Sequence, residues 1–425
     1  MTSRLSSSRT VRKRSATYDP AAAASSPPER GAGLSAARTR YLSGHRRAEL
    51  SMAFQLAAFF RTTLPLDLSR LARMDSGRYH SIWLPDHIVS FWPDSIWTPE
   101  FTDLVESSHS PHRHLDGLAV AAAAGALTSQ TAIATSVVDT VRRHPVLLAQ
   151  AAITIGHLSR GRFILGLGSG ERENCAPYGF DFERSVSRFE EALNVIRLLW
   201  SSEAPVDFAG EFYRLRHARL DAEAFEGRTP PIWIGANAPR MLRLAGRYGD
   251  GWWPTGSDGP DEYAAKLAVV RQAAEAARRD PTAIVPAKMV VCLIGERDEI
   301  REMLRQPLVK AFALQLTAES LRRRGYRHPM SDDWRGIQDI EPDKLTRERL
   351  LSFLESVDVN AILSAVPHGT PKEVAREIKG LYDAGLRVAA ILDYSGMAGL
   401  EFAARSAAKV SATEHEALRL INGAP

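Results

Sequence analysis

The sequence predicts an α/β fold, a (β/α)8 TIM barrel with insertions after its second, fourth and seventh strands. Short apolar runs alternate with segments of helical period from Ala53 to Leu392. Several runs lack polar alternation, as expected for parallel strands that are covered on both faces. No Gly-x-Gly-x-x-Gly motif follows the first strand, so a doubly wound sheet is the less favoured arrangement.

Helix start and stop signals divide the first part of the chain. Gly77 ends the first helix, and Asp116 is an N-cap for an alanine-rich helix. Pro145 lies in the first turn of a third helix, which Gly161 closes. These signals give strands at 53–60, 79–84 and 131–138 and helices at 66–76, 116–127 and 144–161.

The fourth strand is the feature around which the rest is organised. Residues 162–171 are an apolar run that ends in glycines at every second position, followed by Glu171. Glycines at such a strand end let the backbone approach a neighbour closely and adopt dihedrals that are closed to other residues. Glu171 should therefore stand at the carboxyl end of a barrel strand, where this fold places its chemistry.

The second part of the chain completes the barrel. A hairpin is expected at 206–215, and the long charged stretch at 298–360 is interpreted as a helical insertion over the site. Thr370-Pro371 starts the last expected helix, with a Thr cap and proline at the first helical position. The remaining strands are expected at 231–237, 250–256, 287–294 and 386–392, with helices at 187–200, 239–248 and 261–279.

Charge and cysteine content exclude several classes of protein. Residues 1–50 carry ten Lys/Arg and three acids, whereas the whole chain has a net charge of +4, so the remaining residues are slightly acidic. Nothing indicates a nucleic-acid surface on the barrel. Two cysteines are too few for a disulfide scaffold, which fits a reducing compartment, and no apolar run is long enough for a transmembrane segment. We therefore expect a cytoplasmic protein.

The N-terminal residues 1–50 are rich in Ser, Arg and Ala and poor in acids. This composition predicts a disordered basic extension ahead of a barrel domain at 51–425, and it also resembles an organellar transit peptide. Met52 directly precedes the first strand, which leaves a translation start at Met52 open as an alternative.

The strand ends carry the candidate site. Asp86 and His87 follow strand two, and Glu171 follows strand four, so two titratable side chains should face one glycine-lined mouth. One group with a near-neutral pKa and one that burial can tune are what acid–base chemistry on a bound cofactor needs. The turn from Gly235 to Ala238 precedes a helix and offers free amides, a plausible phosphate cradle.

The chain resembles the luciferase-like superfamily, and within it the branch that uses the deazaflavin coenzyme F420. The resemblance extends over residues 52–395 and is carried by 83–87, 144–151, 162–171 and 246–252. Motifs at 172–179, 188–193, 240–242, 328–330 and 336–340 further resemble mycobacterial ketoreductases that act on phthiodiolone-type lipids. Many members dimerise, which makes a homodimer one expectation.

The resemblance implies roles for individual residues. It makes His87 the proton donor or acceptor at the substrate oxygen and Glu171 a second acid, with Asp86 orienting His87 or binding the ring. It also implies a cis peptide at Ser136–Val137 behind the ring, and it leaves a cofactor contact of Asp139 in doubt. The remaining implied cofactor contacts are Gly168, Ser169, Gly170, Gly235, Ala236, Asn237, Ala238 and Thr255.

Departures from related enzymes narrow the substrate. Relatives that act on sugar phosphates have a lysine shortly after the position of Thr255, where this chain has Ser257-Asp258. Phe91, Trp92 and Trp97 predict an apolar pocket for a lipid ketone, or else they only pack the insertion. No metal is expected, because His109, His112 and His114 lie on a loop without neighbouring carboxylates and are interpreted as a solvated cluster.

Three functions follow in order of preference. The first is a deazaflavin-dependent ketoreductase that transfers hydride to a long-chain lipid ketone, because deazaflavin is a hydride donor that reacts poorly with oxygen. The second is a monooxygenase that uses flavin mononucleotide (FMN) and oxygen. The third is a barrel that binds a cofactor without catalysis, against which the intact pair of His87 and Glu171 speaks.

Overall fold

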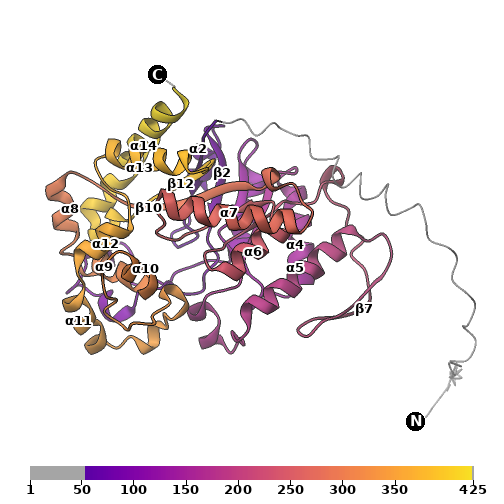
Figure 1. Ribbon diagram of the computed structural model, residues 1–425, viewed down its shortest axis with the longest axis horizontal. Coiled ribbons are helices and arrows are strands. Elements are labelled where there is room, and N and C mark those ends of the chain that lie inside the picture. Colours follow the sequence, from indigo (N-terminus) through magenta and orange to yellow (C-terminus); the bar gives the residue numbers. More distant parts are fainter. Residues whose placement is uncertain (1–52, 424–425) are drawn as a thin grey trace, which may run out of the picture. The chain divides into compact units, whose positions relative to one another are not determined.

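A closed barrel of parallel strands forms the centre of the computed structural model, which describes residues 53–423 (Figure 1). Each strand pairs in parallel with its neighbours, and β12 pairs with β1 to close the ring. The expected extension at 1–50 lies outside the described residues. In barrel order the strands are β1 (Gln55–Phe59), β2 (Tyr79–Leu84), β3 (Ala132–Thr135) with β4 (Val138–Asp139), β5 (Phe163–Gly168), β8 (Ile232–Ile234), β9 (Gly251–Trp252), β10 (Val285–Ile294) and β12 (Val388–Asp393).

Helices cover the outside of this ring, and their caps follow the sequence signals. The Asp116 side chain accepts a hydrogen bond from the Ala119 amide, and Thr370 and Glu373 form a capping box. One element was missed: α14 follows β12 and supplies the eighth helix, so the helix beginning at Pro371 is not the last. The outer helices are α2 (Leu68–Met74), α3 (Gly117–Leu127), α4 (Pro145–Leu158), α5 (Ser185–Ser201), α6 (Pro239–Tyr248), α7 (Pro260–Ala276), α13 (Pro371–Asp383) and α14 (Leu400–Asn422).

Two strand predictions need correction. The expected strand at 131–138 is interrupted between β3 and β4, and the expected strand at 250–256 has ladder pairing only at Gly251 and Trp252. Outside the barrel, the expected hairpin consists of β6 (Val206–Ala209) and β7 (Arg214–Ala218), and β11 (His368–Gly369) adds a short pairing to β10.

Tryptophan side chains fill the barrel interior. The rings of Trp83 and Trp253 stack with centroids 3.7 Å apart, and Trp233 packs against both at a tilt. A Cβ at Gly251 would lie 2.3 Å from the Trp233 ring, so glycine makes room for the tryptophan there. Because this packed interior leaves no pore, ligands must bind at the mouth.

A second hydrophobic core lies in the stretch expected as the helical insertion. Its helices are α8 (Arg297–Met303), α9 (Pro307–Ala311), α10 (Ala318–Arg323), α11 (Arg347–Ser356) and α12 (Val359–Ala365), which gather on the left of Figure 1. Trp92 and Leu104 from the loop after β2, and Phe402 from α14, belong to the same core. The insertion is therefore packed onto the loops of the mouth.

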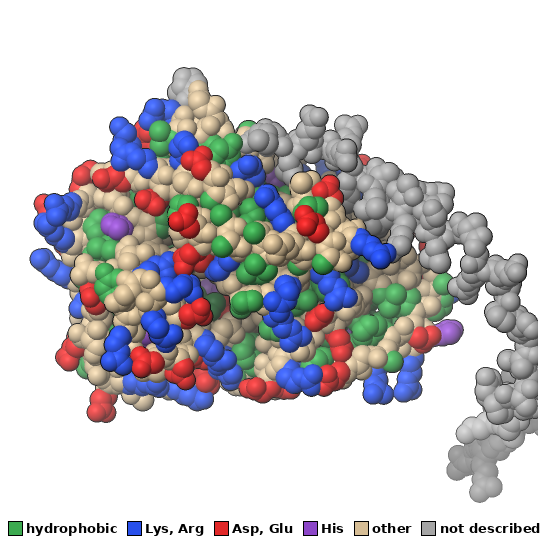
Figure 2. Space-filling model, viewed as in Figure 1, with side chains coloured by type: hydrophobic (Ala, Val, Ile, Leu, Met, Phe, Trp, Pro, Cys, Tyr) green, Lys and Arg blue, Asp and Glu red, His purple; other side chains and the backbone are tan. Residues whose placement is uncertain are grey.

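Positive and negative side chains alternate over the face seen in Figure 2, without a broad area of one sign. Among the helices of residues 53–423, none combines the length and apolarity needed to cross a membrane.

Candidate active site

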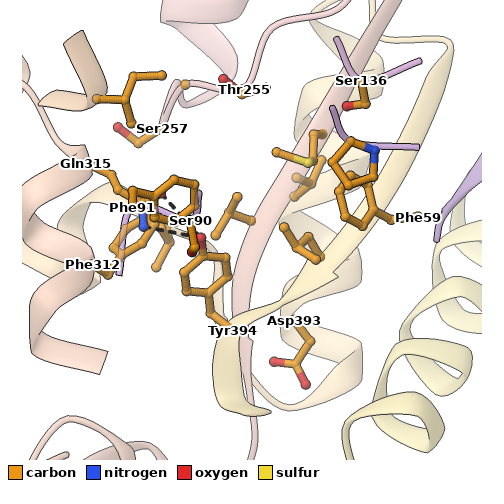
Figure 3. Close-up of a pocket in the computed structure, with 18 of the residues that line it drawn as sticks. Phe59, Ser90, Phe91, Ser136, Thr255, Ser257, Phe312, Gln315, Asp393 and Tyr394 are labelled. Atoms are coloured by element: carbon orange, nitrogen blue, oxygen red, sulfur yellow. Dashed lines mark hydrogen bonds between the residues drawn. The ribbon is translucent and has the colours of Figure 1, made fainter. Parts of the chain in front are cut away.

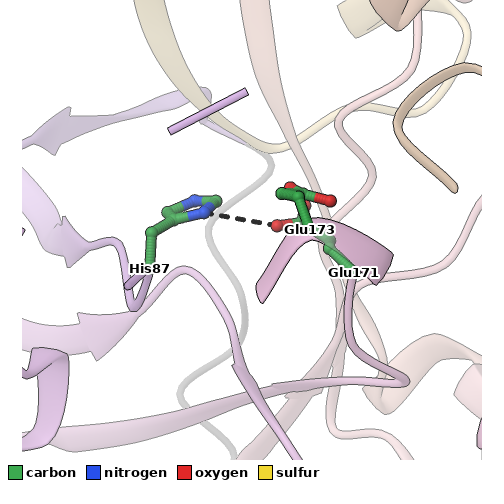
Figure 4. A group of neighbouring side chains, drawn as sticks. All are labelled: His87, Glu171 and Glu173. Atoms are coloured by element: carbon green, nitrogen blue, oxygen red, sulfur yellow. Dashed lines mark ion pairs between the residues drawn. The ribbon is translucent and has the colours of Figure 1, made fainter. Parts of the chain in front are cut away.

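His87 and Glu171 meet at the carboxyl ends of β2 and β5. The two strands end at Leu84 and Gly168, and the loops that follow bring His87 Nδ1 to 3.3 Å from Glu171 Oε2 (Figure 4). The side chains are 16% and 29% exposed, so both reach the cavity and are largely shielded from water. The sequence predicted that both side chains face one mouth, and in the structure they also contact each other there.

Asn174 fixes the geometry of this pair and was not anticipated from the sequence. Its Oδ1 accepts hydrogen bonds from the backbone amides of Ile88 and Val89, at 2.6 and 3.0 Å. The amide orientation is thereby set, and Nδ2 must point toward His87 Nδ1, at 3.0 Å. Nδ2 also lies 3.5 Å from Glu171 Oε2, so one side chain ties the histidine loop to the glutamate loop.

Glu173 is a further acid behind the pair, and it too was missed as a site residue. It is fully buried, its Oε1 lies 3.3 Å from Asn174 Nδ2, and its Oε2 has no hydrogen-bond partner. Burial, followed by the neighbouring charge of Glu171, raises the pKa of Glu173 well above its ordinary value. Glu173 therefore keeps its proton to a higher pH than an ordinary glutamic acid does.

The spacing of this group would also permit a cation. Among the described residues, ligand atoms of His87, Glu171 and Glu173 lie within 4.8 Å of one another. The Asn174 amide donates into the group, and the raised pKa of Glu173 disfavours its carboxylate form, which favours storage of a proton over binding of a metal. The absence of a metal remains a prediction.

A cavity of about 2180 Å³ opens in front of His87 and Glu171. Phe91, Trp92 and Trp97 line it, as expected, and Phe312 and Tyr394 line it from the insertion and from the segment after β12 (Figure 3). Trp92 is almost completely buried, so its ring both packs the second core and forms a wall of the cavity. For Trp92 the two interpretations, an apolar substrate pocket and packing of the insertion, are therefore compatible.

The opposite wall consists of strand ends that could hold a cofactor. Helix α6 begins after Ala238 without a side-chain cap, so amides of its first turn are free to bind an anion. Of the expected cofactor contacts, those that line the cavity are Ser136, Ser169, Gly235, Asn237, Ala238 and Thr255. Those that do not line it are Val137, Gly168, Gly170 and Ala236.

The glycines of β5 primarily accommodate neighbouring chain segments. A Cβ at Gly166 would lie 1.8 Å from the Thr135 carbonyl oxygen, and one at Gly168 would lie 2.7 Å from a Val137 methyl group. The Ser136–Val137 peptide bond is cis, as the resemblance implied. Because Gly168 has no side chain, the Val137 side chain has room to pack behind the cavity wall.

Asp86 and Asp139, two of the expected cofactor contacts, do not line the cavity. Asp86 is buried, does not line the cavity, and bonds Arg142, Arg143 and the Gly117 amide, so it neither orients His87 nor reaches a ring. Asp139 is buried as well and bonds the side chain and amide of Arg142. Both carboxylates are neutralised by arginines, and they anchor the loops that carry the site.

The three histidines at 109, 112 and 114 do not form the solvated cluster that was expected. Only His109 is exposed; His112 lies 3.2 Å from Asp94 and accepts a hydrogen bond from the Ser90 amide. The His114 ring lies 5.3 Å from the His87 ring, between centroids, and lines the cavity. Burial lowers the pKa of His114 to about 3, which keeps its imidazole neutral.

Comparison with known proteins gives consistent matches. Residues 71–387 match the family described as luciferase-like monooxygenase. The chain is 37% identical over 342 residues to the phthiodiolone/phenolphthiodiolone dimycocerosates ketoreductase of Mycobacterium tuberculosis, covering 78% of this chain and 88% of the relative. It is 36% identical over 198 residues to an F420-dependent glucose-6-phosphate dehydrogenase of Kineococcus radiotolerans, covering 44% of this chain and 55% of that enzyme.

Solved structures share the fold. An F420-dependent secondary alcohol dehydrogenase, in complex with an F420–acetone adduct, superposes with a TM-score of 0.64 at 20% identity. The superposition covers 85% of this chain and 99% of that chain.

Proposed function

The chain belongs to the luciferase-like monooxygenase family, and from that premise we propose that it is an F420-dependent ketoreductase for a long-chain lipid ketone. One observation carries the proposal: His87 and Glu171 lie 3.3 Å apart at the edge of a large cavity with aromatic walls. The identity to the mycobacterial ketoreductase supports the choice of ketone reduction.

The cavity fits such a cofactor on the side of β8 and β9. The uncapped first turn of α6 and the Thr255 hydroxyl would hold a phosphate, since free amides at a helix start bind anions. Ser136, Ser169 and Gly235 border the floor on which a flat ring would lie. Reduced F420, when bound, supplies a hydride.

His87 would hold the proton for the ketone oxygen. With its Nδ1 facing Glu171 and Asn174, the histidine has Nε2 as its other proton-carrying atom. Glu171 stabilises a positive charge on the imidazole, and Asn174 offers Nδ1 a hydrogen bond when the ring is neutral. Both states of the ring therefore have a partner, as general acid–base work requires.

The site offers little to a sugar phosphate on the β9 side. Asp258 follows β9 and bonds Lys266 at 2.6 Å, and the Lys288 ammonium donates to the Gly256 carbonyl oxygen. These cations are engaged within the protein. A lipid ketone among Phe91, Trp97 and Phe312 agrees better with such a lining.

A cofactor titration tests the proposal. Purified protein should bind F420 much more tightly than FMN, and with reduced F420 a long-chain ketone should be converted to the alcohol. Tight FMN binding with negligible F420 affinity would instead establish the monooxygenase alternative. Cofactor binding without turnover of any ketone or alcohol would leave a non-catalytic barrel.

Replacing His87 tests the proton step. The His87→Ala variant should lose turnover by about 10²-fold or more with F420 affinity retained, because a positioned acid contributes rates of that order. His109→Ala is the matched control, since His109 is exposed and does not line the cavity. Equal kcat in the two variants would remove His87 from the mechanism.

A further inference from the structure

Arg61 is a cation inside the active-site cavity that nothing in the proposed reaction uses. It follows β1 by two residues, and the segment that it begins lies against the histidine loop. Thr63 and His114 form an antiparallel bridge, and the Leu64 amide donates to the Arg113 carbonyl oxygen at 2.9 Å. Arg61 therefore lies at the mouth, on the same side as His114 and His87.

The Arg61 guanidinium has no partner. Within residues 53–423 it makes no hydrogen bond and no ion pair, although its side chain lines the cavity and reaches its open space. Because Arg61 is exposed to the cavity space, a ligand that enters the cavity meets a guanidinium with no protein anion beside it.

The surrounding charges do not neutralise Arg61. Of the acids that line this side, Glu171 pairs with His87, Asp67 with Arg73 and Glu414 with Arg78. Asp393 keeps its negative charge and accepts hydrogen bonds from Ser395 and Ser406. Arg70 and Arg113 line the same cavity, and within the described residues their guanidinium groups also have no hydrogen bond or ion pair. This side of the cavity thus carries excess positive charge.

We propose that Arg61, assisted by Arg70, forms a subsite for a carboxylate or phosphate group. Guanidinium binds these groups through two parallel hydrogen bonds. The group can come from the substrate or from the phosphate and glutamyl tail of the cofactor. The barrel order favours the substrate, because β1 lies four strands from β8 in either direction, across the mouth from the α6 amides that would take the cofactor phosphate.

The substrate class is therefore a long-chain ketone that also carries an acidic group. This refinement rests on the proposed ketone reduction, whereas anion binding by Arg61 does not. Calorimetry separates anion binding from ketone reduction, because it measures ligand binding directly and without cofactor. The probes are a medium-chain oxo fatty acid and its methyl ester, which differ only in the charge of one end.

Arg61→Gln should weaken binding of the oxo acid relative to the ester by about tenfold or more, in line with the loss of charge-assisted hydrogen bonds. Arg73→Gln is the matched control: Arg73 lies on the neighbouring helix α2, is exposed and does not line the cavity. That variant should keep the wild-type ratio of acid to ester binding, and both variants should retain F420 affinity.

Other outcomes overturn the proposal in distinct ways. An unchanged ratio of acid to ester in Arg61→Gln, with unchanged F420 affinity, removes the anion subsite altogether. An unchanged ratio together with weaker binding of F420, but not of its tail-free chromophore, assigns the anion to the cofactor and overturns the substrate class. Failure of the wild type to reduce either ketone would refute the proposed function and leave the calorimetric result standing.

Discussion

At the scale of single residues, the state of Glu173 is the strongest electrostatic consequence of the fold. Two carboxyl groups and one imidazole share the Asn174 amide, and Glu173 is the fully buried member. Neighbouring carboxyl groups in a site of low polarity resist double ionisation, so one of them keeps a proton. Glu173 thereby keeps its proton to a higher pH than an isolated glutamic acid does.

The pH dependence of stability tests this state. The folded protein keeps a proton on Glu173 at pH values where the unfolded chain, with a pKa near 4.5, has lost it. The free energy of unfolding therefore falls as pH rises from about 4.5 to the raised pKa, by up to about 1.4 kcal/mol per unit. Glu173→Gln should lack this fall in chemical denaturation, whereas the exposed Glu203→Gln should show it. Parallel slopes for the wild type and Glu173→Gln would contradict a protonated Glu173.

Sequence reasoning predicted that His87 and Glu171 lie at one mouth because the strand ends meet there, which is a property of the fold. It could not distinguish them from Asp86 and Asp139, which also follow strands but face Arg142. Which arginine reaches which carboxylate depends on loop conformation. The role of Asn174 was hidden for the same reason, because it depends on two backbone amides of another loop.

At the scale of elements, strand β5 can approach β3 closely because residue 166 is a glycine and has no side chain. Gly166→Ala would place a Cβ 1.8 Å from the Thr135 carbonyl oxygen, and backbone in the centre of a barrel cannot yield. We expect destabilisation by more than about 3 kcal/mol in guanidinium denaturation. Gly259→Ala is the control, since nothing lies within 4 Å of its added Cβ, and similar stability of the two variants would refute the packing argument.

The elements that could be predicted are those with strong local signals. Strand β2 and helix α6 have the predicted bounds, because apolar runs and a proline at the helix start mark them. Helix α14 was missed because a 3-10 segment, Tyr394–Ala398, separates it from β12 and because few of its residues are buried.

At the scale of the whole molecule, the cavity lies between two hydrophobic cores. The barrel supplies its floor, and the second core, built from the insertion and the loop after β2, supplies Trp92 and Phe312. The two parts are joined by polar contacts, notably Arg324, which bonds the Ser257 carbonyl oxygen and Glu262, each at 2.7 Å. The fit of a long substrate should therefore depend on how firmly the insertion is held.

Arg324→Met tests that dependence. The variant leaves Glu262 with Arg323 and the Gly259 amide as partners and frees the Ser257 carbonyl oxygen, so the insertion should open more often while the barrel stays folded. Limited proteolysis should cut the insertion several-fold faster, and KM for a long-chain ketone should rise more than kcat falls. Arg327→Met is the matched control, because Arg327 pairs with Asp332 on the surface of the same insertion, where both side chains are mostly exposed. If both variants are cut at the wild-type rate, the Arg324 contacts do not hold the insertion in place, and the second core alone must do so.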